Sequence, residues 1–206
     1  RVLGNVGVLK ACKRKRPGMI IAICGCMAQQ PEVVEKIKKS YPYVDILFGT
    51  HVRHKLPEFV YNRLNGSKRI FENPETNEPF KEGVPLRRDG TFKAWLPIMQ
   101  GCNNFCSYCI VPYTRGRENS REPEAVLKEA ELLIKSGAKE IMLLGQNVNS
   151  YGKGNKDNTD FADLLRAVNA LPGDFRIRFM TSHPKDCSDK LLLAMSECEK
   201  VEKHLH

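Results

Sequence analysis

The sequence predicts an α/β protein in two parts, a doubly wound parallel sheet at the N-terminal end followed by an incomplete (β/α) barrel. Three observations lead to this prediction. Apolar runs of strand length alternate with segments of helical periodicity. A polar stretch of poor periodicity, residues 67–90, separates two such series. Polar residues follow the strands of the second series, where the sites of (β/α) barrels lie.

The first series occupies residues 1–66, which we expect to form the first domain. Two continuous apolar runs, residues 19–24 and 44–48, predict strands buried in a parallel sheet. Apolar side chains at helical spacing predict three helices. These helices cover residues 1–16, 31–41 and 52–64. Strands that alternate with helices in this way indicate a parallel sheet with crossover connections.

The second series occupies residues 91–206, after a linker predicted at residues 67–90. Its apolar runs predict strands at residues 94–100, 140–144 and 176–180. Helical spacing predicts helices at residues 123–135, 160–171 and 189–197. Residues 120–122 offer an N-terminal cap for the first of these helices. About three βα units fit before His206, against eight in a full barrel, so the predicted barrel is incomplete.

Composition indicates a globular protein with a polyanionic partner. The chain has 206 residues, 41% of them apolar, and a formal charge of +9. No apolar run approaches the roughly 18 residues of a membrane span, and no signal peptide is visible, so free cysteines suggest the reducing cytoplasm. The positive charge suits RNA. We expect a fragment at both ends, because the chain starts at Arg1 rather than Met and stops within an apolar–polar pattern.

Three cysteines, Cys102, Cys106 and Cys109, stand in a C-x3-C-x2-C spacing just after the strand predicted at residues 94–100. Three thiolates in one short loop can hold three corners of a cubane iron–sulfur cluster and leave the fourth iron open. A zinc site would need a fourth Cys or His, and the next one along the chain is His183. A disulfide framework is disfavoured, because the number of cysteines in the loop is odd.

This spacing resembles the radical S-adenosylmethionine (radical SAM) superfamily. The longer run GCNNFCSYCIVPYTRGRENSR at residues 101–121, followed by LLGQNVNSYG at residues 143–152, resembles the methylthiotransferases, and among them the MiaB-type tRNA enzymes. The resemblance implies a partial radical SAM barrel and then a small RNA-binding β domain. The later barrel units and that domain would lie outside this chain.

The resemblance implies that Cys102, Cys106 and Cys109 are the catalytic, metal-ligating residues of a 4Fe–4S cluster. The open iron would bind the amino and carboxylate groups of S-adenosylmethionine (SAM). An electron passed through the cluster would then cleave SAM to methionine and a 5′-deoxyadenosyl radical, while the protein binds, orients and excludes water.

Three further residues are expected to contact SAM. The superfamily favours an aromatic residue before the third cysteine, close to the adenine of the cofactor, and Tyr108 stands there. Gln146 and Asn147 follow the strand predicted at residues 140–144 and are suitably placed to hydrogen-bond SAM. Packing in the core is the alternative for Tyr108, and loop capping is the alternative for the two amides.

The run GCMAQQ at residues 25–30 resembles the N-terminal domain of the methylthiotransferases. In that family the cysteine of the Gly-Cys pair ligates an auxiliary iron–sulfur cluster, which implies that Cys26 is a metal ligand. Cys24 matches no ligand position, and we expect it to be a core thiol. Two further family ligands would precede this chain. The full-length enzyme would therefore hold two 4Fe–4S clusters, of which one is fully liganded here.

Four other features are ambiguous. Arg115 and Arg117 suit a phosphate or the SAM carboxylate, because guanidinium binds anions in a bidentate manner, but structural ion pairs are the alternative. The basic cluster at residues 13–16 is either a solvated helix end or an RNA contact. His183 follows a strand and is expected to line the site without ligating a metal.

The resemblance implies a methylthiotransferase that adds a methylthio group to carbon 2 of isopentenyladenosine, next to the anticodon in tRNA. We expect a cytoplasmic monomer that binds the tRNA anticodon loop, has an electron donor protein as partner and does not bind membranes. One alternative is a methylthiotransferase that acts on threonylcarbamoyladenosine in tRNA or on a ribosomal protein. Another is a non-enzymatic, metal-stabilised RNA-binding module, which a SAM cleavage assay would distinguish.

Overall fold

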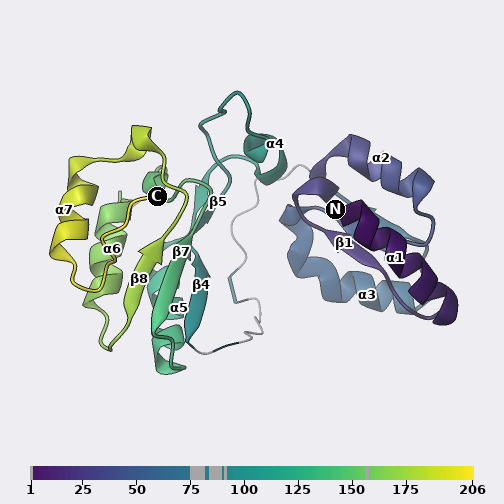
Figure 1. Ribbon diagram of the computed structural model, residues 1–206, viewed down its shortest axis with the longest axis horizontal. Coiled ribbons are helices and arrows are strands. Elements are labelled where there is room, and N and C mark those ends of the chain that lie inside the picture. The colour runs from purple at the N-terminus through teal and green to yellow at the C-terminus, as the bar shows by residue number, and fades with distance from the viewer. Residues whose placement is uncertain (1, 75–81, 84–89, 91, 156–157) are drawn as a thin grey trace. The chain divides into compact units, whose positions relative to one another are not determined.

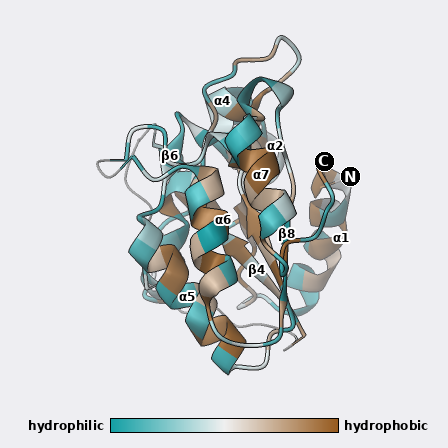
Figure 2. Cartoon of the chain, turned by 90° about the vertical axis from the view of Figure 1, so that its left-hand side faces the viewer, coloured by the Kyte–Doolittle hydropathy of each residue, from teal (hydrophilic) through white to brown (hydrophobic). Residues whose placement is uncertain are grey.

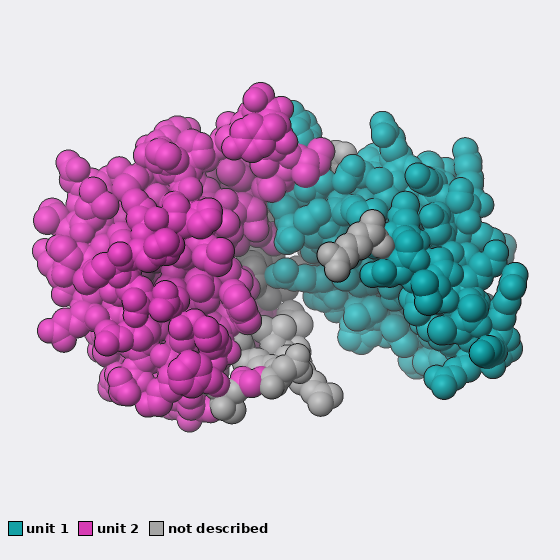
Figure 3. Space-filling model, in the orientation of Figure 1, with its two compact units in different colours: residues 1–78, 113–115 teal, residues 79–112, 116–206 magenta. Residues whose placement is uncertain are grey.

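The computed structural model describes residues 2–74, 82–83, 90, 92–155 and 158–206, with the elements shown in Figure 1. The chain divides into two compact units, coloured separately in Figure 3. The first unit comprises residues 1–78 and 113–115, and the second comprises residues 79–112 and 116–206. Each unit contains a parallel sheet with helices, which confirms the predicted α/β class. The two predicted domain boundaries stay a prediction.

The first unit is built on a three-stranded parallel sheet in the order β1–β2–β3. Its strands are β1 (Ala22–Cys24), β2 (Ile46–Phe48) and β3 (Ile70–Glu72). Neighbouring residues of β2 point to opposite faces, so Leu47 joins one apolar cluster while Ile46 and Phe48 join another. Both faces of this short sheet are therefore covered, as expected for parallel strands.

Helices cover the two faces of this sheet. They are α1 (Val2–Lys15), α2 (Pro31–Ser40) and α3 (Leu56–Leu64). Val6 of α1 and Ile37 of α2 pack in the cluster that contains Leu47. Phe59 of α3 packs on the opposite face, with its ring centroid 5.6 Å from that of Phe48. A reversal of strand order, which defines a doubly wound sheet, does not occur among the described strands, so that topology stays a prediction.

Two predictions for the first unit need correction. The predicted linker contains β3, a strand of three residues that is too short to show periodicity in the sequence. The rest of the linker lies largely outside the described residues. The helix predicted at residues 52–64 is two elements, the 3-10 helix η2 (Thr50–Lys55) followed by α3. Pro57 in the first turn of α3 explains the break, because proline favours the start of a helix over its interior.

A buried carboxylate, Asp45, joins three elements of the first unit. It forms ion pairs with Lys13 of α1 and with Arg63 of α3, the latter at 2.9 Å. It also accepts a hydrogen bond of 2.9 Å from Ile21 N. Burial raises the pKa of Asp45, but these three hydrogen bonds outweigh it, and the pKa lies below its usual value. Lys13 therefore has a structural role in the basic cluster at residues 13–16.

The second unit is built on a parallel sheet in the order β4–β7–β8. Its strands are β4 (Lys93–Pro97), β7 (Glu140–Leu144) and β8 (Arg176–Phe179). Their side chains alternate between buried and less buried, so Leu96 and Leu143 are fully enclosed while Trp95 is 54% exposed. These strands confirm the predicted starts of the three βα units.

Three helices form one layer against this sheet, in front of the strands in Figure 2. They are α5 (Pro123–Lys135), α6 (Phe161–Ala170) and α7 (Asp189–Glu197). The side chains of Asp160 and Ser188 cap α6 and α7. The N-cap residue of α5, Glu122, lies within the predicted cap at residues 120–122, but its side chain forms no capping hydrogen bond, and Ser120 accepts from Gly152 N. Closure into a barrel stays a prediction.

The strand predicted at residues 94–100 is split. After β4, the strand β5 (Met99–Gln100) leaves the parallel sheet and pairs antiparallel with β6 (Asn119–Ser120). The short helix α4 (Val111–Arg115) lies between β5 and β6 in the chain. The 3-10 helices η3 (Val148–Ser150) and η4 (Pro184–Asp186) follow β7 and β8. No helix in the described ranges has the length and apolar character that a membrane crossing requires.

Candidate functional site

The three cysteines of the C-x3-C-x2-C run lie in one loop of the second unit, between β5 and α4. Cys102 is buried, and Cys106 and Cys109 are half-buried. All eight cysteines of the chain are within the described ranges, and each is a free thiol. The disulfide alternative therefore has no support in this structure, and the three thiols of the loop are free.

Backbone contacts fix the start of this loop. Gly101 adopts a φ of +77°, and an added Cβ would overlap the carbonyl oxygen of Arg117, so only glycine fits there. Cys102 N donates to Gly116 O at 3.2 Å, and Glu118 N donates to the side chain of Asn103 at 3.2 Å. The segment at residues 116–118 thus holds the first cysteine in place.

The second half of the loop is a tight turn. Cys109 N donates to Cys106 O at 2.8 Å. Phe105 has a φ of +46°, which is uncommon for a residue with a side chain and indicates a backbone held by its surroundings. The Arg117 guanidinium lies 4.5 Å from the centre of the Phe105 ring. Arg117 therefore contacts the cysteine loop at Phe105.

The donor set of this loop fits an iron–sulfur cluster. Thiolates are the ligands that such clusters use, and three free thiols are available. Burial raises the pKa of the Cys102 thiol, and the neighbouring Glu118 carboxylate adds to this, so metal binding has to displace a proton. No three His, Cys, Asp or Glu side chains among the described residues surround a single point suited to one metal ion. A cubane does not require this, since each thiolate binds a different iron.

His183 lies beside this loop. Its Nε2 is 4.0 Å from Cys106 Sγ, and its Nδ1 accepts a hydrogen bond from Lys185 N at 3.2 Å. The sequence places these residues far apart, so spacing alone did not link His183 to a particular cysteine. Only the return of the chain after β8 brings the imidazole next to the thiol.

The predicted SAM-contacting residues have different environments. Tyr108 is 92% exposed, so it is not a core aromatic. Asn147 is buried, and its Nδ2 donates to Asp186 Oδ2 at 2.7 Å. The side-chain oxygens of Gln146 and Asn147 are buried and have no hydrogen-bond partner in the described structure. An unpaired buried acceptor costs about 1–3 kcal/mol, so both oxygens favour a ligand that donates hydrogen bonds.

Further unpaired oxygens lie in the loops of this unit. Those of Asn149 and Ser182 follow β7 and β8, and that of Glu118 precedes β6. Burial also raises the pKa of the Glu118 carboxyl. Sequence reasoning missed these three residues, because their burial depends on loops that are distant in the sequence. Two of them follow carboxyl ends of parallel strands, where ligands bind in α/β sheets.

Cys26 lies in the first unit, at the start of the 3-10 helix η1 (Cys26–Gln29), directly after β1. It is half-buried, and Arg115, which belongs to the same unit, donates from Nε to Cys26 Sγ at 3.0 Å. The expectation that Cys24 is a core thiol is wrong, because Cys24 is exposed. It shares the exposed face of β1 with Ala22, whereas Ile23 points into the core.

The chain matches one protein superfamily and is similar to several curated proteins. The sequence profile of the radical SAM superfamily matches residues 96–202, just over half of the chain. The whole chain is 53% identical to a protein of Acetivibrio thermocellus named tRNA-2-methylthio-N(6)-dimethylallyladenosine synthase, and it covers 43% of that protein. Proteins of the same name in Clostridium perfringens and Thermoanaerobacter are 53% and 51% identical, with 46% and 44% of their lengths covered. The chain thus spans less than half of these curated relatives.

Proposed function

This chain belongs to the radical SAM superfamily, and we propose that it is part of a tRNA methylthiotransferase. The full-length enzyme would add a methylthio group to carbon 2 of isopentenyladenosine, next to the anticodon of tRNA. The observation that carries the proposal is the loop of three free cysteines, in the unit whose neighbouring loops hold unpaired buried oxygens. The shared name of the relatives supports this target over threonylcarbamoyladenosine or a ribosomal protein.

We infer that Cys102, Cys106 and Cys109 hold the radical SAM cluster as thiolates. When bound, a 4Fe–4S cluster and SAM together supply reductive cleavage of the sulfonium. The role of this chain is to present three sulfurs on one loop. Gly101 and the backbone at residues 116–118 keep that loop in place. His183, close to Cys106, lines the same loop without being a ligand in this proposal.

Gln146 and Asn147 are proposed to bind SAM through their unpaired oxygens. SAM carries an ammonium group and two ribose hydroxyls, which are hydrogen-bond donors that suit amide acceptors. The bond from Asn147 Nδ2 to Asp186 fixes the amide and leaves its oxygen available. Tyr108 is proposed to cover the adenine with its exposed ring, which packs against nothing in the core.

Cys26 is proposed as a ligand of the auxiliary cluster. In the full-length enzyme, cysteines outside this chain would complete its ligands, which makes two 4Fe–4S clusters in all. The hydrogen bond from Arg115 holds the Cys26 sulfur in a defined position. The auxiliary cluster would provide or carry the sulfur that reaches the adenosine.

The partners are proposed from charge and from the reaction. A formal charge of +9 suits an RNA substrate, and the anticodon loop exposes unstacked bases. Reduction of the cluster requires an electron donor protein. We propose that the full-length enzyme is a monomer in the cytoplasm, where tRNA is modified.

The experiment that tests this function is nucleoside analysis of tRNA. A strain that lacks the full-length gene should accumulate isopentenyladenosine without the methylthio group, and expression of the full-length protein should restore 2-methylthio-isopentenyladenosine. Restoration of a methylthio group only on threonylcarbamoyladenosine would favour the alternative target. If expression of the full-length protein leaves the tRNA without the methylthio group, and the purified protein does not cleave SAM, the RNA-binding module is favoured.

A further inference from the structure

Arg115 donates a hydrogen bond to a cysteine sulfur. Its Nε is 3.0 Å from Cys26 Sγ, and both residues belong to the first unit. The sulfur of a neutral thiol is a weak acceptor, whereas a thiolate that ligates a metal is negatively charged and accepts strongly from a cation. This contact therefore suits a metal-ligating cysteine better than a structural one.

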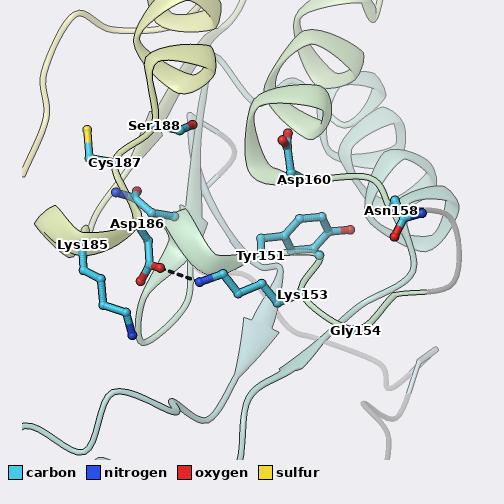
Figure 4. Close-up of a pocket in the computed structure, with 11 residues that line it drawn as sticks. Tyr151, Lys153, Gly154, Asn158, Asp160, Lys185, Asp186, Cys187 and Ser188 are labelled. Carbon is cyan, nitrogen blue, oxygen red and sulfur yellow. Dashed lines mark hydrogen bonds and ion pairs between the residues drawn. The ribbon is translucent and has the colours of Figure 1, made fainter.

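Other cations of the chain pair with carboxylates instead. In the cavity shown in Figure 4, the dashed line joins Lys153 to Asp186. The buried guanidinium of Arg121 is 2.8 Å from a carboxylate oxygen of Glu129. Among the residues that the structure describes, no Asp or Glu lies at ion-pair distance from Arg115. The structural ion pair that the sequence left open for Arg115 is therefore not formed within the described ranges.

The backbone that presents Arg115 is fixed. Arg115 is the last residue of α4, and its neighbour Thr114 is only 1% exposed. The Thr114 carbonyl accepts a hydrogen bond of 3.0 Å from Thr50 Oγ1, at the start of η2. Gly116 follows with a φ of +77°, which favours glycine. Little backbone freedom is left to lose when the guanidinium holds a ligand.

The backbone that presents Cys26 is fixed as well. Gly25 has a φ of +124° and a ψ of −172°, a combination that essentially only glycine adopts. The Gly25 carbonyl accepts from Ala28 N at 3.0 Å, and Ala28 is completely buried. The sulfur and its donor are thus both held by their own backbones, as in metal sites where a second residue orients the ligand.

A hydrogen bond of this kind has two consequences for an iron–sulfur cluster. Hydrogen bonds to the sulfurs and the nearby charge are among the factors that set the reduction potential. A cationic donor stabilises the reduced cluster, because that form carries more negative charge. Residues that orient a metal ligand also help to retain the metal, and their loss typically costs about 10–100-fold in metal affinity.

We propose that Arg115 is a positioning residue of the auxiliary cluster, which holds the Cys26 sulfur in place as a ligand and makes the cluster easier to reduce. The inference rests on the proposed function, because it requires that Cys26 ligates this cluster. Arg115 contacts neither SAM nor RNA in this proposal. The competing role is the anion contact that the sequence left open, with a phosphate or with the SAM carboxylate.

The first test measures how firmly the auxiliary cluster is held. The background is the full-length protein in which Cys102, Cys106 and Cys109 are replaced by alanine, so that the auxiliary cluster is the one that remains. Arg115→Met, which keeps an unbranched side chain without a donor, should hold iron about 10–100-fold more weakly in competition with a chelator. The matched control is Arg14→Met, an exposed arginine of α1, which should retain iron as the background does. Equal retention in the two variants would overturn the proposal.

The second test is a redox titration of the same proteins, followed by electron paramagnetic resonance. Arg115→Met should shift the midpoint potential to more negative values, and Arg115→Lys should recover part of that shift because it restores the positive charge. A purely structural defect would not depend on charge, so a lysine variant that behaves as the methionine variant does would overturn the proposal. If Arg115→Met loads no cluster, an unchanged midpoint potential in Arg115→Lys would overturn it instead.

The third test examines the competing anion contacts in the full-length enzyme with its loop cysteines intact. Arg115→Met should leave the dissociation constant for SAM and the salt dependence of binding to an anticodon stem-loop RNA unchanged. Weaker SAM binding would assign Arg115 to the SAM carboxylate. A slope of log affinity against log salt that is lower by about 0.7–0.9 would assign it to one phosphate. Either result overturns the proposal.

The two levels of inference fail in different ways. If the background protein without the loop cysteines binds no iron, the auxiliary cluster does not exist, and the proposed function itself is contradicted. If that protein holds a cluster whose stability and potential do not respond to Arg115→Met, only the role of Arg115 is contradicted.

Discussion

At the scale of single residues, the thiols of the cysteine loop differ in exposure but are held by one backbone. Cys102 is buried and its backbone N–H donates to the Gly116 carbonyl, whereas Cys106 and Cys109 are half-buried. Each is proposed to bind a different iron, so none can substitute for another. This makes single substitutions informative.

In a full-length protein, Cys102→Ala, Cys106→Ala and Cys109→Ala should each abolish SAM cleavage, because each removes one of three protein ligands. The measurement is 5′-deoxyadenosine formed after reconstitution and reduction. Cys12→Ala, which removes an exposed thiol of α1 in the first unit, is the control and should retain cleavage. Substantial product from any one of the three loop variants would count against the assignment.

Two cysteines of the first unit, Cys24 and Cys26, should behave differently from the loop cysteines and from each other. In a full-length protein, Cys26→Ala should lose methylthiolation and keep reductive SAM cleavage, because the proposed ligands of the radical cluster lie in the other unit. Cys24→Ala should retain both activities, since Cys24 is an exposed thiol two residues away. Nucleoside analysis and the 5′-deoxyadenosine assay measure the two activities. The reverse pattern would assign the ligand to Cys24.

At the scale of elements, loops are held by close backbone approaches and by buried charge. The cysteine loop depends on Gly101, whose positive φ and missing side chain let the Arg117 carbonyl come close. In the first unit, α1, α3 and the start of β1 are joined through the single carboxylate of Asp45. Each feature predicts the effect of one substitution.

Gly101→Ala should destabilise the cysteine loop by about 1–3 kcal/mol and reduce iron loading, because the new methyl group overlaps backbone and the φ is unfavourable. The matched control is Gly7→Ala in α1, where an added Cβ meets open space. That change should stabilise its helix by about 0.5–1 kcal/mol. Iron per chain and thermal unfolding are the measurements. Unchanged iron loading in Gly101→Ala would show that the close approach is dispensable.

Asp45→Asn should destabilise the first unit by about 3 kcal/mol at neutral pH, because it leaves Lys13 and Arg63 without their buried partner. The pKa of Asp45 is lowered on folding, so the stabilisation is present above the unfolded pKa of about 3.9 and is lost as the pH falls through the folded pKa. The difference between the two proteins should therefore shrink toward low pH.

Hydrogen exchange at the β2 amides measures the free energy of unfolding of the first unit alone. The control Glu35→Gln breaks an exposed ion pair with Lys38 on α2 and should have little effect. A destabilisation by Asp45→Asn that stays constant from neutral to acidic pH would contradict the role of the carboxylate charge.

At the scale of the whole molecule, the two units contain different numbers of the proposed cluster ligands. The second unit contains the complete C-x3-C-x2-C loop, and the first contributes Cys26 with Cys24 two residues away. Anaerobic reconstitution of this chain should load about four irons, one cluster's worth, because cubanes take three or four cysteines.

Replacing the three loop cysteines together in this chain should remove nearly all of the iron. Colorimetric iron analysis and the ultraviolet–visible spectrum measure the loading. About eight irons in the unmodified chain would indicate a second set of ligands. Cys12, Cys187 and Cys198 would be the first to replace in that case.

The candidate site could be predicted from the sequence only in part. The cysteine spacing and the polar positions after the strands are local patterns, so the sequence predicts Cys102, Cys106, Cys109, Gln146 and Asn147 as site residues. The environment of these residues was not predictable. Whether an amide oxygen is paired depends on side chains from other loops, as the bond between Asn147 and Asp186 across 39 positions shows.

The sequence by itself determined the alternation of strands and helices, because apolar spacing follows from the geometry of each element. It also determined the cysteine loop, since three cysteines fall within eight consecutive residues. Only the tertiary structure decided that Cys24 is exposed, that β5 leaves the sheet to pair with β6, and that Lys185 faces a cavity. These features arise from contacts between segments distant in the chain, about which local periodicity has no information.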